Sequence, residues 1–439
     1  MGSAERMDIA LDIAESQLAE APLMVCSAMG GITDKIIETY TLAENGDTEG
    51  STAVFERIKD THYTCARSFL NGDLLNETVE KMDAMFAQFA SLIKGITLLK
   101  DCSPRSKDAL LSFGERLSTL LIYSRAVERG FNTELADSRE LIRTDSNFTS
   151  AKVDSETTEN LISEKLFPEK NKLIIAQGFI ASNSEGVTTT LGRGGSDYSA
   201  SIFGAALNAS EIQIWTDVTG IMTSDPRIIP EAATIPEISY EEAGELAFFG
   251  AKVVHPATIQ PAVGKNIPVY VKNTSAPEKK GTRISSDNIK PGIKAISAKK
   301  GITVVNVTSS RMLEAYGFLK RIFNIFDEEE TPVDLVTTSE VSVSVTIENT
   351  SRLNSITEKL QELGSVNTEK NRSIVSLVGS GLWKDPQFPA KVFEALETIP
   401  VKMISLGASE VNLSIVVPQE HTEDALKNLH NKFFSRKDA

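Results

Sequence analysis

Residues 188 to 200 read Thr-Thr-Thr-Leu-Gly-Arg-Gly-Gly-Ser-Asp-Tyr-Ser-Ala and lead directly into an apolar stretch. The glycines of this segment allow the main chain to approach a ligand closely, and the amides that open a helix at Ser196 carry partial positive charge. Arg193 adds a planar guanidinium that suits a carboxylate or a phosphate. The segment predicts an anion-binding turn before a helix, although the same pattern is typical of any glycine-rich turn between a strand and a helix.

The composition sets the class of protein. Because 439 residues exceed one ordinary hydrophobic core, we expect two or three domains. Hydrophobic residues make up 41% and charged residues 24% of the chain, which is typical of a soluble globular protein. The net charge of -15 disfavours nucleic acid or an anionic membrane as a partner, since both attract a clustered basic face. An anionic substrate needs only a local positive site and is still allowed.

The cysteines and the apolar runs indicate a compartment. Cys26, Cys65 and Cys102 follow no metal or redox spacing, which predicts reduced thiols. No uninterrupted apolar run reaches membrane-spanning length, and the first residues do not resemble a signal peptide. We therefore expect a cytoplasmic protein without a membrane-spanning segment.

The N-terminal part of the chain alternates predicted helices and strands. A helix that Ser3 can cap comes first, and the run from Leu23 to Ala28 predicts a strand that ends in the turn Met29-Gly30-Gly31-Ile32-Thr33. Residues 34–130 are predicted to be mostly helical, with a turn at Ser112-Phe113-Gly114-Glu115. Short strands at 173–175 and 212–215 then alternate with helices at 196–208 and 240–249. This alternation predicts an α/β sheet that helices cover on both faces.

The C-terminal part contains an internal duplication. Residues 273–292 are rich in Asn, Ser, Pro, Lys and Gly, which predicts a linker and a domain boundary. Beyond it, the order strand, helix, strand, strand, helix repeats. The predicted elements are strand 302–307, helix 315–326, strands 333–337 and 341–347, then strand 374–377, helix 388–397, strands 401–406 and 411–417, and helix 420–434. The duplication predicts either ligand-binding regulatory modules or a dimerisation domain.

Several motifs together resemble the aspartate kinases of the amino-acid kinase superfamily. They are Ser27-Ala28-Met29-Gly30-Gly31-Ile32-Thr33, Ser112-Phe113-Gly114-Glu115, the Arg193 segment, Trp215-Thr216-Asp217-Val218-Thr219-Gly220 with Ser224-Asp225-Pro226-Arg227, Phe249-Gly250-Ala251-Lys252-Val253-Val254-His255-Pro256, and Val333-Asp334-Leu335-Val336-Thr337-Thr338-Ser339-Glu340-Val341-Ser342. The resemblance covers the chain from Gly2 onward. It implies an amino-acid kinase fold, a mainly parallel sheet sandwiched by helices, followed by two ferredoxin-like ACT domains.

The resemblance also implies domain limits. The catalytic domain would span residues 1–285 and the regulatory region residues 286–439. Within the regulatory region, the first ACT domain would span about 308–370, and the second would combine 292–307 with 371–439. Paired ACT domains imply a homodimer or a homotetramer that forms through them.

The resemblance assigns roles to residues of the catalytic domain. Aspartate would be bound by Thr33, Glu115, Phe179, Arg193 and Ser196, with Arg193 on the α-carboxylate and Glu115 facing the α-amino group. ATP would be bound by Ser27, Gly30, Gly31, Thr216, Asp217, Met222, Arg227 and Lys252. Asp197 and Lys252 would act at the reacting centre. Without the resemblance, Glu115 would be interpreted as a helix N-terminal residue and Lys252 as a solvated lysine.

The resemblance further implies an allosteric effector. The pattern of lysine-sensitive members is followed by Met312, Tyr316, Gly317, Phe318, Leu319, Val333, Asp334, Ser339, Glu340 and Val341. Because Asp334 and Glu340 could hold a cationic amino acid, lysine is the preferred inhibitor and threonine the second choice.

The implied reaction transfers the γ-phosphoryl group of ATP to the β-carboxylate of L-aspartate, giving 4-phospho-L-aspartate. The barrier is mainly electrostatic because two anions must meet, so positive groups and Mg²⁺ must neutralise the spreading charge. No protein base is required, since the attacking carboxylate is already ionised at neutral pH. The implied cofactor is therefore ATP with Mg²⁺, without a dedicated metal site of the protein.

The sequence departs from the family pattern at two places. The family begins with a strand ending in Lys-Phe-Gly-Gly-Thr-Ser, whereas this chain starts at Met1-Gly2-Ser3. We expect an upstream start or a truncated chain, and little kinase activity from the sequence as written; the alternative is a catalytically impaired regulatory homologue that binds an amino acid. Met222 stands where many relatives carry tyrosine, which removes a phenolic hydrogen bond. Acetylglutamate, glutamate 5- and uridylate kinases share the superfamily fold but lack the paired ACT domains.

Overall fold

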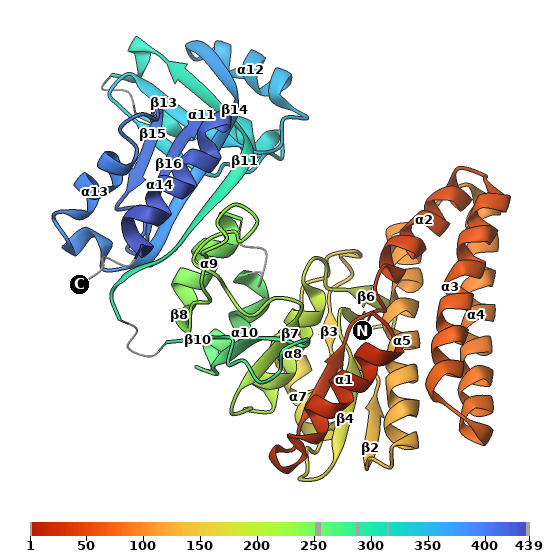
Figure 1. The fold of residues 1–439 in the computed structure, drawn as a ribbon. Helices are drawn as coiled ribbons and strands as arrows, with labels where there is room; N and C mark the ends of the chain where they lie inside the picture. Colours follow the sequence, from red (N-terminus) through yellow and green to blue (C-terminus); the bar gives the residue numbers. More distant parts are fainter. Residues whose placement is uncertain (1, 251–255, 287–289, 314–315, 436–439) are drawn as a thin grey trace. The chain divides into compact units, whose positions relative to one another are not determined.

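The computed structural model describes residues 2–250, 256–286, 290–313 and 316–435 (Figure 1). The chain divides into two compact units. We call Met1–Thr219 with Ala257–Lys280 the N-terminal unit, and Gly220–Pro256 with Gly281–Ala439 the C-terminal unit.

Helices dominate the first part of the N-terminal unit. Three of them begin at a side-chain cap: Ser3 accepts a hydrogen bond from the Arg6 amide, and Asp47 and Ser103 cap the helices that start at Thr48 and Pro104 in the same way. These helices are α1 (Ala4–Glu15), α2 (Ile32–Glu44), α3 (Thr48–Phe69), α4 (Gly72–Leu99) and α5 (Pro104–Glu128). They share one large hydrophobic core, which confirms the predicted helical region.

A parallel three-stranded sheet lies beside these helices, in the order β1-β4-β2. Cys26 at the end of β1 is opposite Gln177 at the end of β4, so both strands end at the same edge. The remaining elements of the unit are β1 (Leu23–Cys26), β2 (Thr133–Ala136), α6 (Ser138–Leu141), β3 (Arg143–Thr144), α7 (Ser155–Lys165), β4 (Leu173–Gln177), β5 (Ile180–Asn183), β6 (Thr188–Thr190), α8 (Gly195–Ala206), β7 (Ile212–Thr216), α10 (Gln260–Gly264) and β9 (Val269–Asn273). The strands β3, β5 and β6 form a small second sheet, and β7 pairs with β9 in parallel.

The predicted turn at Ser112-Phe113-Gly114-Glu115 is wrong, because α5 runs through it without interruption. A Cβ atom on Gly114 would lie 3.0 Å from the Cβ of Ala28. The glycine therefore allows the helix to approach the turn after β1 and does not break the helix.

Helix α4 is the longest helix among the described residues. With 28 residues it is long and apolar enough to cross a membrane by length and composition alone. Its Met82, Phe86 and Phe89 are buried in the helical core, and Phe89 stacks on Phe55 of α3 with ring centroids 5.0 Å apart. In the described part of the chain it is a packed helix of the N-terminal unit.

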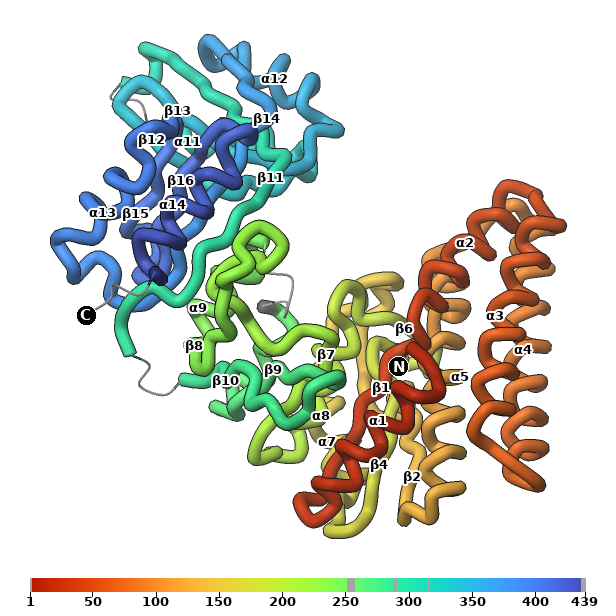
Figure 2. The backbone as a smooth tube through the Cα atoms, viewed as in Figure 1, coloured from red at the N-terminus to blue at the C-terminus, as the bar shows by residue number. Residues whose placement is uncertain are grey.

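The C-terminal unit is built on a six-stranded sheet in the order β12-β13-β11-β14-β16-β15. Two long antiparallel strands, β11 and β14, run through both halves of this sheet (Figure 2). The elements are β8 (Glu237–Ser239), α9 (Tyr240–Phe248), β10 (Thr282–Ser285), β11 (Gly292–Thr308), α11 (Phe318–Glu328), β12 (Val336–Thr338), β13 (Ser342–Ile347), α12 (Leu353–Gln361), β14 (Ser365–Ser380), α13 (Phe388–Ala395), β15 (Met403–Leu406), β16 (Asn412–Pro418) and α14 (Thr422–Phe434). The predicted duplication is confirmed.

Short 3-10 helices connect some of these elements. They are η1 (Leu18–Glu20), η2 (Pro256–Ile259), η3 (Ser310–Met312), η4 (Leu382–Lys384) and η5 (Gln419–His421).

The contacts divide the chain differently from the predicted boundary at residue 285. Phe249, directly after α9, is buried in one cluster with Ile302, Val304, Leu335 and other residues of the six-stranded sheet. In addition, the segment expected to be a linker contains β10, which pairs with β8 in parallel. Apolar packing therefore groups Phe249, which precedes the predicted boundary, with the six-stranded sheet.

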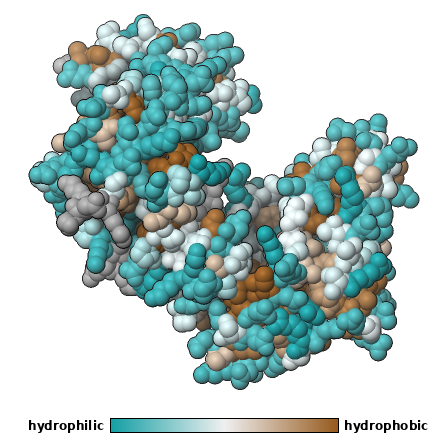
Figure 3. Space-filling model, in the orientation of Figure 1, coloured by the Kyte–Doolittle hydropathy of each residue, from teal (hydrophilic) through white to brown (hydrophobic). Residues whose placement is uncertain are grey.

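The surface is mostly hydrophilic in the view of Figure 3, in keeping with the net charge of -15. Large exposed hydrophobic side chains include Leu98 and Leu99 at the end of α4 and Leu319 and Phe323 on α11. Cys26, Cys65 and Cys102 are buried and unpaired.

Candidate functional site

The turn after β1 is the first part of the candidate site. Gly31 adopts a φ of 72° and caps α2, a backbone conformation that favours glycine. Ser27 and Gly30 are exposed on this turn, and Thr33 lies half-buried in the first turn of α2. The start of α2 directs backbone amides towards this turn, which makes the turn suitable for an anionic ligand.

Glu115 lies against the same turn, on the buried face of α5. Its Oε1 accepts a hydrogen bond from the Ala28 amide at 3.2 Å, whereas its buried Oε2 has no partner among the described residues. Burial raises the pKa of Glu115 to about 8. A carboxylate held in this way is suited to an ammonium group, because that cation would satisfy the free oxygen and restore the negative charge.

Polar residues that the sequence analysis missed hold α5 to the strand ends. The Ser118 hydroxyl donates to the Ser27 carbonyl at 2.7 Å, and the Gln177 side chain donates to the Thr119 hydroxyl at 3.3 Å. The Gly178 amide donates to the Cys26 carbonyl at 2.8 Å, joining the ends of β4 and β1. The carboxyl ends of parallel strands are a common place for ligands in α/β folds.

The glycine-rich turn before α8 has the predicted form. Gly192 and Gly194 have φ values of 74° and 72°, and Gly194 caps α8. Arg193 is exposed and makes no ion pair with any described residue. Asp197 lies in the first turn of α8, where burial raises its pKa to about 6.

Phe179 connects this turn to β4. It has a φ of 66°, and its amide donates to the Ser199 hydroxyl of α8 at 3.0 Å. A Cβ atom on Gly178 would lie 2.7 Å from the Ser196 hydroxyl, and one on Gly195 would lie 2.6 Å from the Phe179 ring. These glycines allow the start of α8 to pack directly on the end of β4. The structure therefore brings Phe179 and Ser196 together.

Two further charged residues of α5 are held within the N-terminal unit, and one of them contacts β6. Asp108 of α5 is fully buried and accepts hydrogen bonds from the Thr149 amide and from the amide and hydroxyl of Thr190, so it fixes β6 before the glycine turn. Burial raises its pKa despite these bonds. Arg116 stacks on Phe113 at 4.7 Å, and its pKa is lowered to about 10 by burial. The one sequence signal for Asp108 and Arg116 is that both lie inside the predicted helical region that contains Glu115.

The predicted nucleotide-binding residues lie on two stretches. Thr216 ends β7, where its carbonyl accepts from the Thr274 amide at 2.9 Å, and its hydroxyl contacts the Asp217 carboxylate at 3.3 Å. Met222 forms an isolated bridge with Thr234 in the C-terminal unit. Lys252 lies outside the described residues.

Arg227 follows Met222 on the same loop of the C-terminal unit. It forms a two-pronged ion pair with Asp225, with N–O distances of 3.0 and 2.7 Å. The pair lowers the pKa of Asp225. The Arg227 side chain is 88% exposed, so its guanidinium is accessible to a phosphate.

The predicted effector residues surround α11 and β12. Gly317 caps α11 with a φ of 76°, Phe318 is buried, and Tyr316 is fully exposed. The Ser339 hydroxyl is within 2.7 Å of the Ser342 hydroxyl, across the turn that contains Glu340. Met312, Val333, Leu319 and Val341 are the apolar members of this set; the first two pack against the core around α11, and the last two are exposed.

Asp334 is already paired in the structure. The Lys299 ammonium contacts its Oδ1 at 2.9 Å and also contacts Glu348 at 2.9 Å. The Asp334 side chain is 8% exposed, and its buried Oδ2 has no partner among the described residues. Burial raises the pKa of Asp334, while Lys299 acts in the opposite direction. Lys299 thus occupies one oxygen of Asp334, and the other oxygen is buried and without a partner among the described residues.

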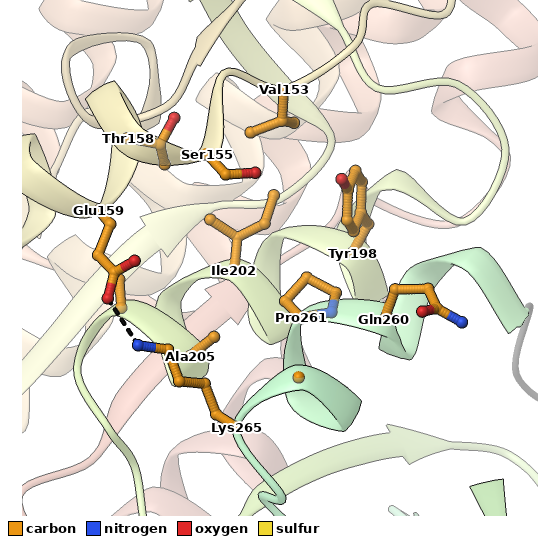
Figure 4. Close-up of a pocket in the computed structure, with 12 residues that line it drawn as sticks. Val153, Ser155, Thr158, Glu159, Tyr198, Ile202, Ala205, Gln260, Pro261 and Lys265 are labelled. Atoms are coloured by element: carbon orange, nitrogen blue, oxygen red, sulfur yellow. Dashed lines mark hydrogen bonds and ion pairs between the residues drawn. The ribbon is translucent and has the colours of Figure 1, made fainter.

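A separate cavity of about 360 Å³ lies beside α8 in the N-terminal unit (Figure 4). Its floor includes Ile202 and Ala205, and Tyr198 lies at one side. Glu159 and Lys265 form an ion pair of 2.8 Å at its rim. None of the predicted site residues lines it among the described residues. No group of three or more His, Cys, Asp or Glu side chains in this part of the chain could hold a metal ion.

Comparison with known proteins identifies the family. The family model described as "Amino acid kinase family" matches residues 1–273, and an ACT domain model matches residues 375–433. Lysine-sensitive aspartokinase 3 of Escherichia coli (strain K12) is 36% identical over 445 residues, covering 98% of this chain and 96% of the relative. Aspartokinase 2, chloroplastic, of Arabidopsis thaliana is 36% identical over 453 residues, covering 98% and 82%.

Comparison with solved structures identifies the same family. The crystal structure of E. coli aspartokinase III in complex with aspartate and ADP (R-state) has a TM-score of 0.86 and 36% identity, covering 99% of this chain and 97% of that one. The complex of the same enzyme with lysine and aspartate (T-state) has a TM-score of 0.81 and 36% identity, covering 98% and 96%. The predicted amino-acid kinase fold with C-terminal ACT architecture is confirmed. This chain belongs to the aspartokinase family.

Proposed function

We propose that this chain transfers the γ-phosphoryl group of ATP to the β-carboxylate of L-aspartate. A β-carboxylate oxygen forms the new bond to phosphorus, the bond from the γ-phosphorus to the oxygen bridging to the β-phosphate breaks, and ADP leaves with that electron pair. The products are 4-phospho-L-aspartate and ADP. The solved relative with aspartate and ADP bound, at 36% identity over nearly the whole chain, supports this proposal.

The arrangement of Glu115 and Arg193 carries the proposal for the amino acid. Glu115 has a buried oxygen without a partner beside the β1 turn, and Arg193 lies exposed on the glycine turn before α8. An α-amino acid offers a cation and an anion for these two groups, with Thr33, Phe179 and Ser196 completing the site. A two-pronged bond from Arg193 to the α-carboxylate would orient the substrate.

The phosphoryl group would be handled by the turns rather than by a base. The amides at Gly30 and Gly31 and the Ser27 hydroxyl would contact phosphates, with Thr216, Asp217, Met222, Arg227 and Lys252 on the nucleotide side. Mg²⁺ would arrive with ATP and neutralise phosphate charge. Asp197, whose carboxylate makes no hydrogen bond with described residues, would help to order the groups around the reacting centre.

We further propose regulation by lysine through the region that follows residue 285. The solved relative with lysine and aspartate bound supports lysine as the effector. In this chain, the free Oδ2 of Asp334 is suited to the side-chain ammonium, and the amides opening α11 at Gly317 and Phe318 are suited to the α-carboxylate.

Assembly and location complete the proposal. Exposed apolar side chains at the sheet edge, Val336 of β12 and Val341 beside it, favour pairing of ACT domains between chains in a homodimer or homotetramer. Three buried free cysteines and an acidic surface favour the cytoplasm. The division into catalytic residues 1–285 and regulatory residues 286–439 is kept as a functional proposal, supported by the family match over residues 1–273.

The experiment is to incubate the full-length enzyme with ATP, Mg²⁺ and aspartate in the presence of hydroxylamine. An acyl phosphate is trapped as a hydroxamate, so aspartyl hydroxamate should form in step with ADP. Glutamate and N-acetylaspartate are matched controls, because the first lengthens the side chain and the second removes the ammonium group. ADP release without hydroxamate would contradict the proposed acceptor.

A further inference from the structure

The loop from Met222 to Thr234 is a closed, hydrogen-bonded unit. The Thr223 amide donates to the Ala233 carbonyl at 2.9 Å, and the Ala233 amide donates to the Thr223 hydroxyl at 3.0 Å. Arg227 extends from this closed loop and is braced by Asp225. Thr223 therefore closes the base of the loop that carries Arg227.

The loop is anchored in the second half of the C-terminal unit. Ile229 is 3% exposed and belongs to the same hydrophobic core as Ile296 of β11 and Leu426 and Leu429 of α14. The Ile296 amide donates to the Thr223 carbonyl at 2.8 Å. The loop thus shares a core with the last repeat of the sheet, although it carries residues that we assign to the nucleotide.

One polar contact joins this loop to α14. The Nε2 atom of His430 lies 3.0 Å from the Thr223 hydroxyl, and both residues are buried. The His430 ring also packs on Phe434 with ring centroids 4.8 Å apart. Because the Thr223 hydroxyl accepts the Ala233 amide, its own O–H can donate a hydrogen bond to the ring nitrogen. The hydroxyl then joins the loop base to α14 through two hydrogen bonds, one to each side.

We infer that His430, at the far end of the chain, is a positioning residue for the nucleotide site: through Thr223 it holds the loop that presents Arg227 to ATP. The inference rests on the proposed function, since it assumes that this loop lies on the nucleotide side. It goes beyond that proposal by giving the last helix a part in ATP binding. This contact differs from the other buried hydrogen bonds of α14. Those bonds join the helix to the regulatory region, whereas the contact between His430 and Thr223 joins it to the loop that carries Arg227.

The structure offers a matched control on the same helix. The Thr422 hydroxyl at the start of α14 is buried and lies 2.8 Å from the Ser373 hydroxyl of β14, without touching the loop. Thr422→Val and Thr223→Val each remove a buried hydroxyl with little change in shape. Both should lower the melting temperature, but only Thr223→Val should alter ATP binding.

The experiment measures kcat and the KM values for ATP and aspartate in the full-length enzyme. Loss of the hydrogen bond in His430→Leu or Thr223→Val should raise the KM for ATP about three- to tenfold, with the KM for aspartate nearly unchanged. His430→Gln keeps a polar group near the Nε2 position and should restore most of the ATP affinity. In the double variant, the two effects should not multiply, because both changes remove the same contact.

Two outcomes would overturn the inference: His430→Leu and Thr223→Val giving the same KM for ATP as Thr422→Val, or His430→Gln behaving as His430→Leu. Circular dichroism confirms that each variant is folded, and Thr223→Val tests the contact from the loop side if His430→Leu does not fold. Arg227→Ala separates this result from the proposed function. If Arg227→Ala raises the KM for ATP and the His430 variants do not, the nucleotide assignment stands and the role of His430 is wrong.

Discussion

Glu115 shows how one buried side chain can define a substrate. Its carboxyl lies on a helix that glycine brings close to the β1 turn, and only one of its oxygens is satisfied by the protein. A buried, half-satisfied carboxylate costs free energy until a cation arrives. Binding of an ammonium group to the unpaired oxygen would recover this free energy.

The raised pKa of Glu115 predicts the direction of a pH effect on stability. Its ordinary value of 4.5 applies to the unfolded chain and about 8 to the folded one, so the folded state binds more protons between these values. The contribution of Glu115 to the free energy of unfolding is therefore largest below pH 4.5 and falls as the pH rises towards 8. Denaturant titrations at several pH values should show that the free energy of unfolding falls with this pH dependence in the wild type and not in Glu115→Gln.

An exposed carboxylate provides the control for that measurement. Glu49→Gln, on the surface of α3, should retain the wild-type slope between pH 5 and pH 8, a range taken from the Glu115 shift. An unchanged slope in Glu115→Gln would contradict the shifted pKa.

Arg193 carries the second prediction at this scale. Loss of one partner of a desolvated charge pair costs about 2 to 5 kcal/mol, so Arg193→Ala should raise the aspartate KM steeply with little change for ATP. Arg193→Lys keeps the charge but loses the planar guanidinium that can bind a carboxylate with two hydrogen bonds. It should therefore recover only part of the affinity for aspartate. Steady-state kinetics with each substrate varied in turn measures both effects. Wild-type aspartate kinetics in Arg193→Ala would remove this residue from the site.

At the scale of the element, α5 contains a motif whose local structure differs from the prediction. Ser112-Phe113-Gly114-Glu115 was predicted to be a turn, since glycine in an otherwise helical pattern often marks a break. The structure shows a close approach instead, with Ala28 of a neighbouring segment where a side chain on Gly114 would lie. A neighbour that is distant in sequence cannot be deduced from the local pattern.

This close approach predicts opposite results for two glycine substitutions. Gly95→Ala in α4 meets no atom within 4 Å and should stabilise the protein by about 0.5 to 1 kcal/mol through helix propensity. Gly114→Ala has the same propensity gain, but its Cβ meets Ala28 at 3.0 Å and should displace the β1 turn. Thermal unfolding and the aspartate KM of the two variants test this contrast. Equal stabilisation by both would contradict the packing role of Gly114.

The longer elements were predictable and the shorter ones were not. The mostly helical region 34–130 and the apolar strands at 173–175 and 212–215 were predicted from local signals, and the structure confirms them with α2 to α5, β4 and β7. The short strands β5 and β6 depend on contacts such as the hydrogen bonds from Thr190 to the buried Asp108. The assignment of site residues came from motif resemblance, and their roles stay predictions.

At the scale of the molecule, the C-terminal unit contains more than the regulatory sheet. Phe249 and Ile229, both from before residue 285, are buried with residues of the six-stranded sheet. Lys299 links the two parts, since its ammonium pairs with Asp334 and lies 5.0 Å from the ring centroid of Phe248 on α9. Any ligand that competes with Lys299 for Asp334 therefore also changes the environment of α9.

The effector proposal can be tested at this pair. Asp334→Ala should abolish inhibition by lysine, because the acid that receives the ligand ammonium is lost. An allosteric coupling of roughly 1 to 3 kcal/mol would produce the inhibition in the wild type. Glu348→Gln is the control. Glu348 is the exposed partner of Lys299, and its ion pair is expected to contribute only about 0 to 1 kcal/mol to the free energy of unfolding. Calorimetry with lysine and threonine shows which amino acid binds; undiminished lysine inhibition in Asp334→Ala would contradict the assigned site.

The most direct test of the central claim follows an oxygen atom through the reaction. Aspartate labelled with ¹⁸O at both oxygens of its β-carboxylate is incubated with the full-length enzyme, ATP, Mg²⁺ and hydroxylamine, and the phosphate released from the trapped product is analysed by mass spectrometry. Attack of the β-carboxylate on the γ-phosphorus predicts one ¹⁸O atom in each phosphate, because hydroxylamine displaces phosphate together with the bridging oxygen. Unlabelled phosphate would show that this carboxylate is not the phosphoryl acceptor.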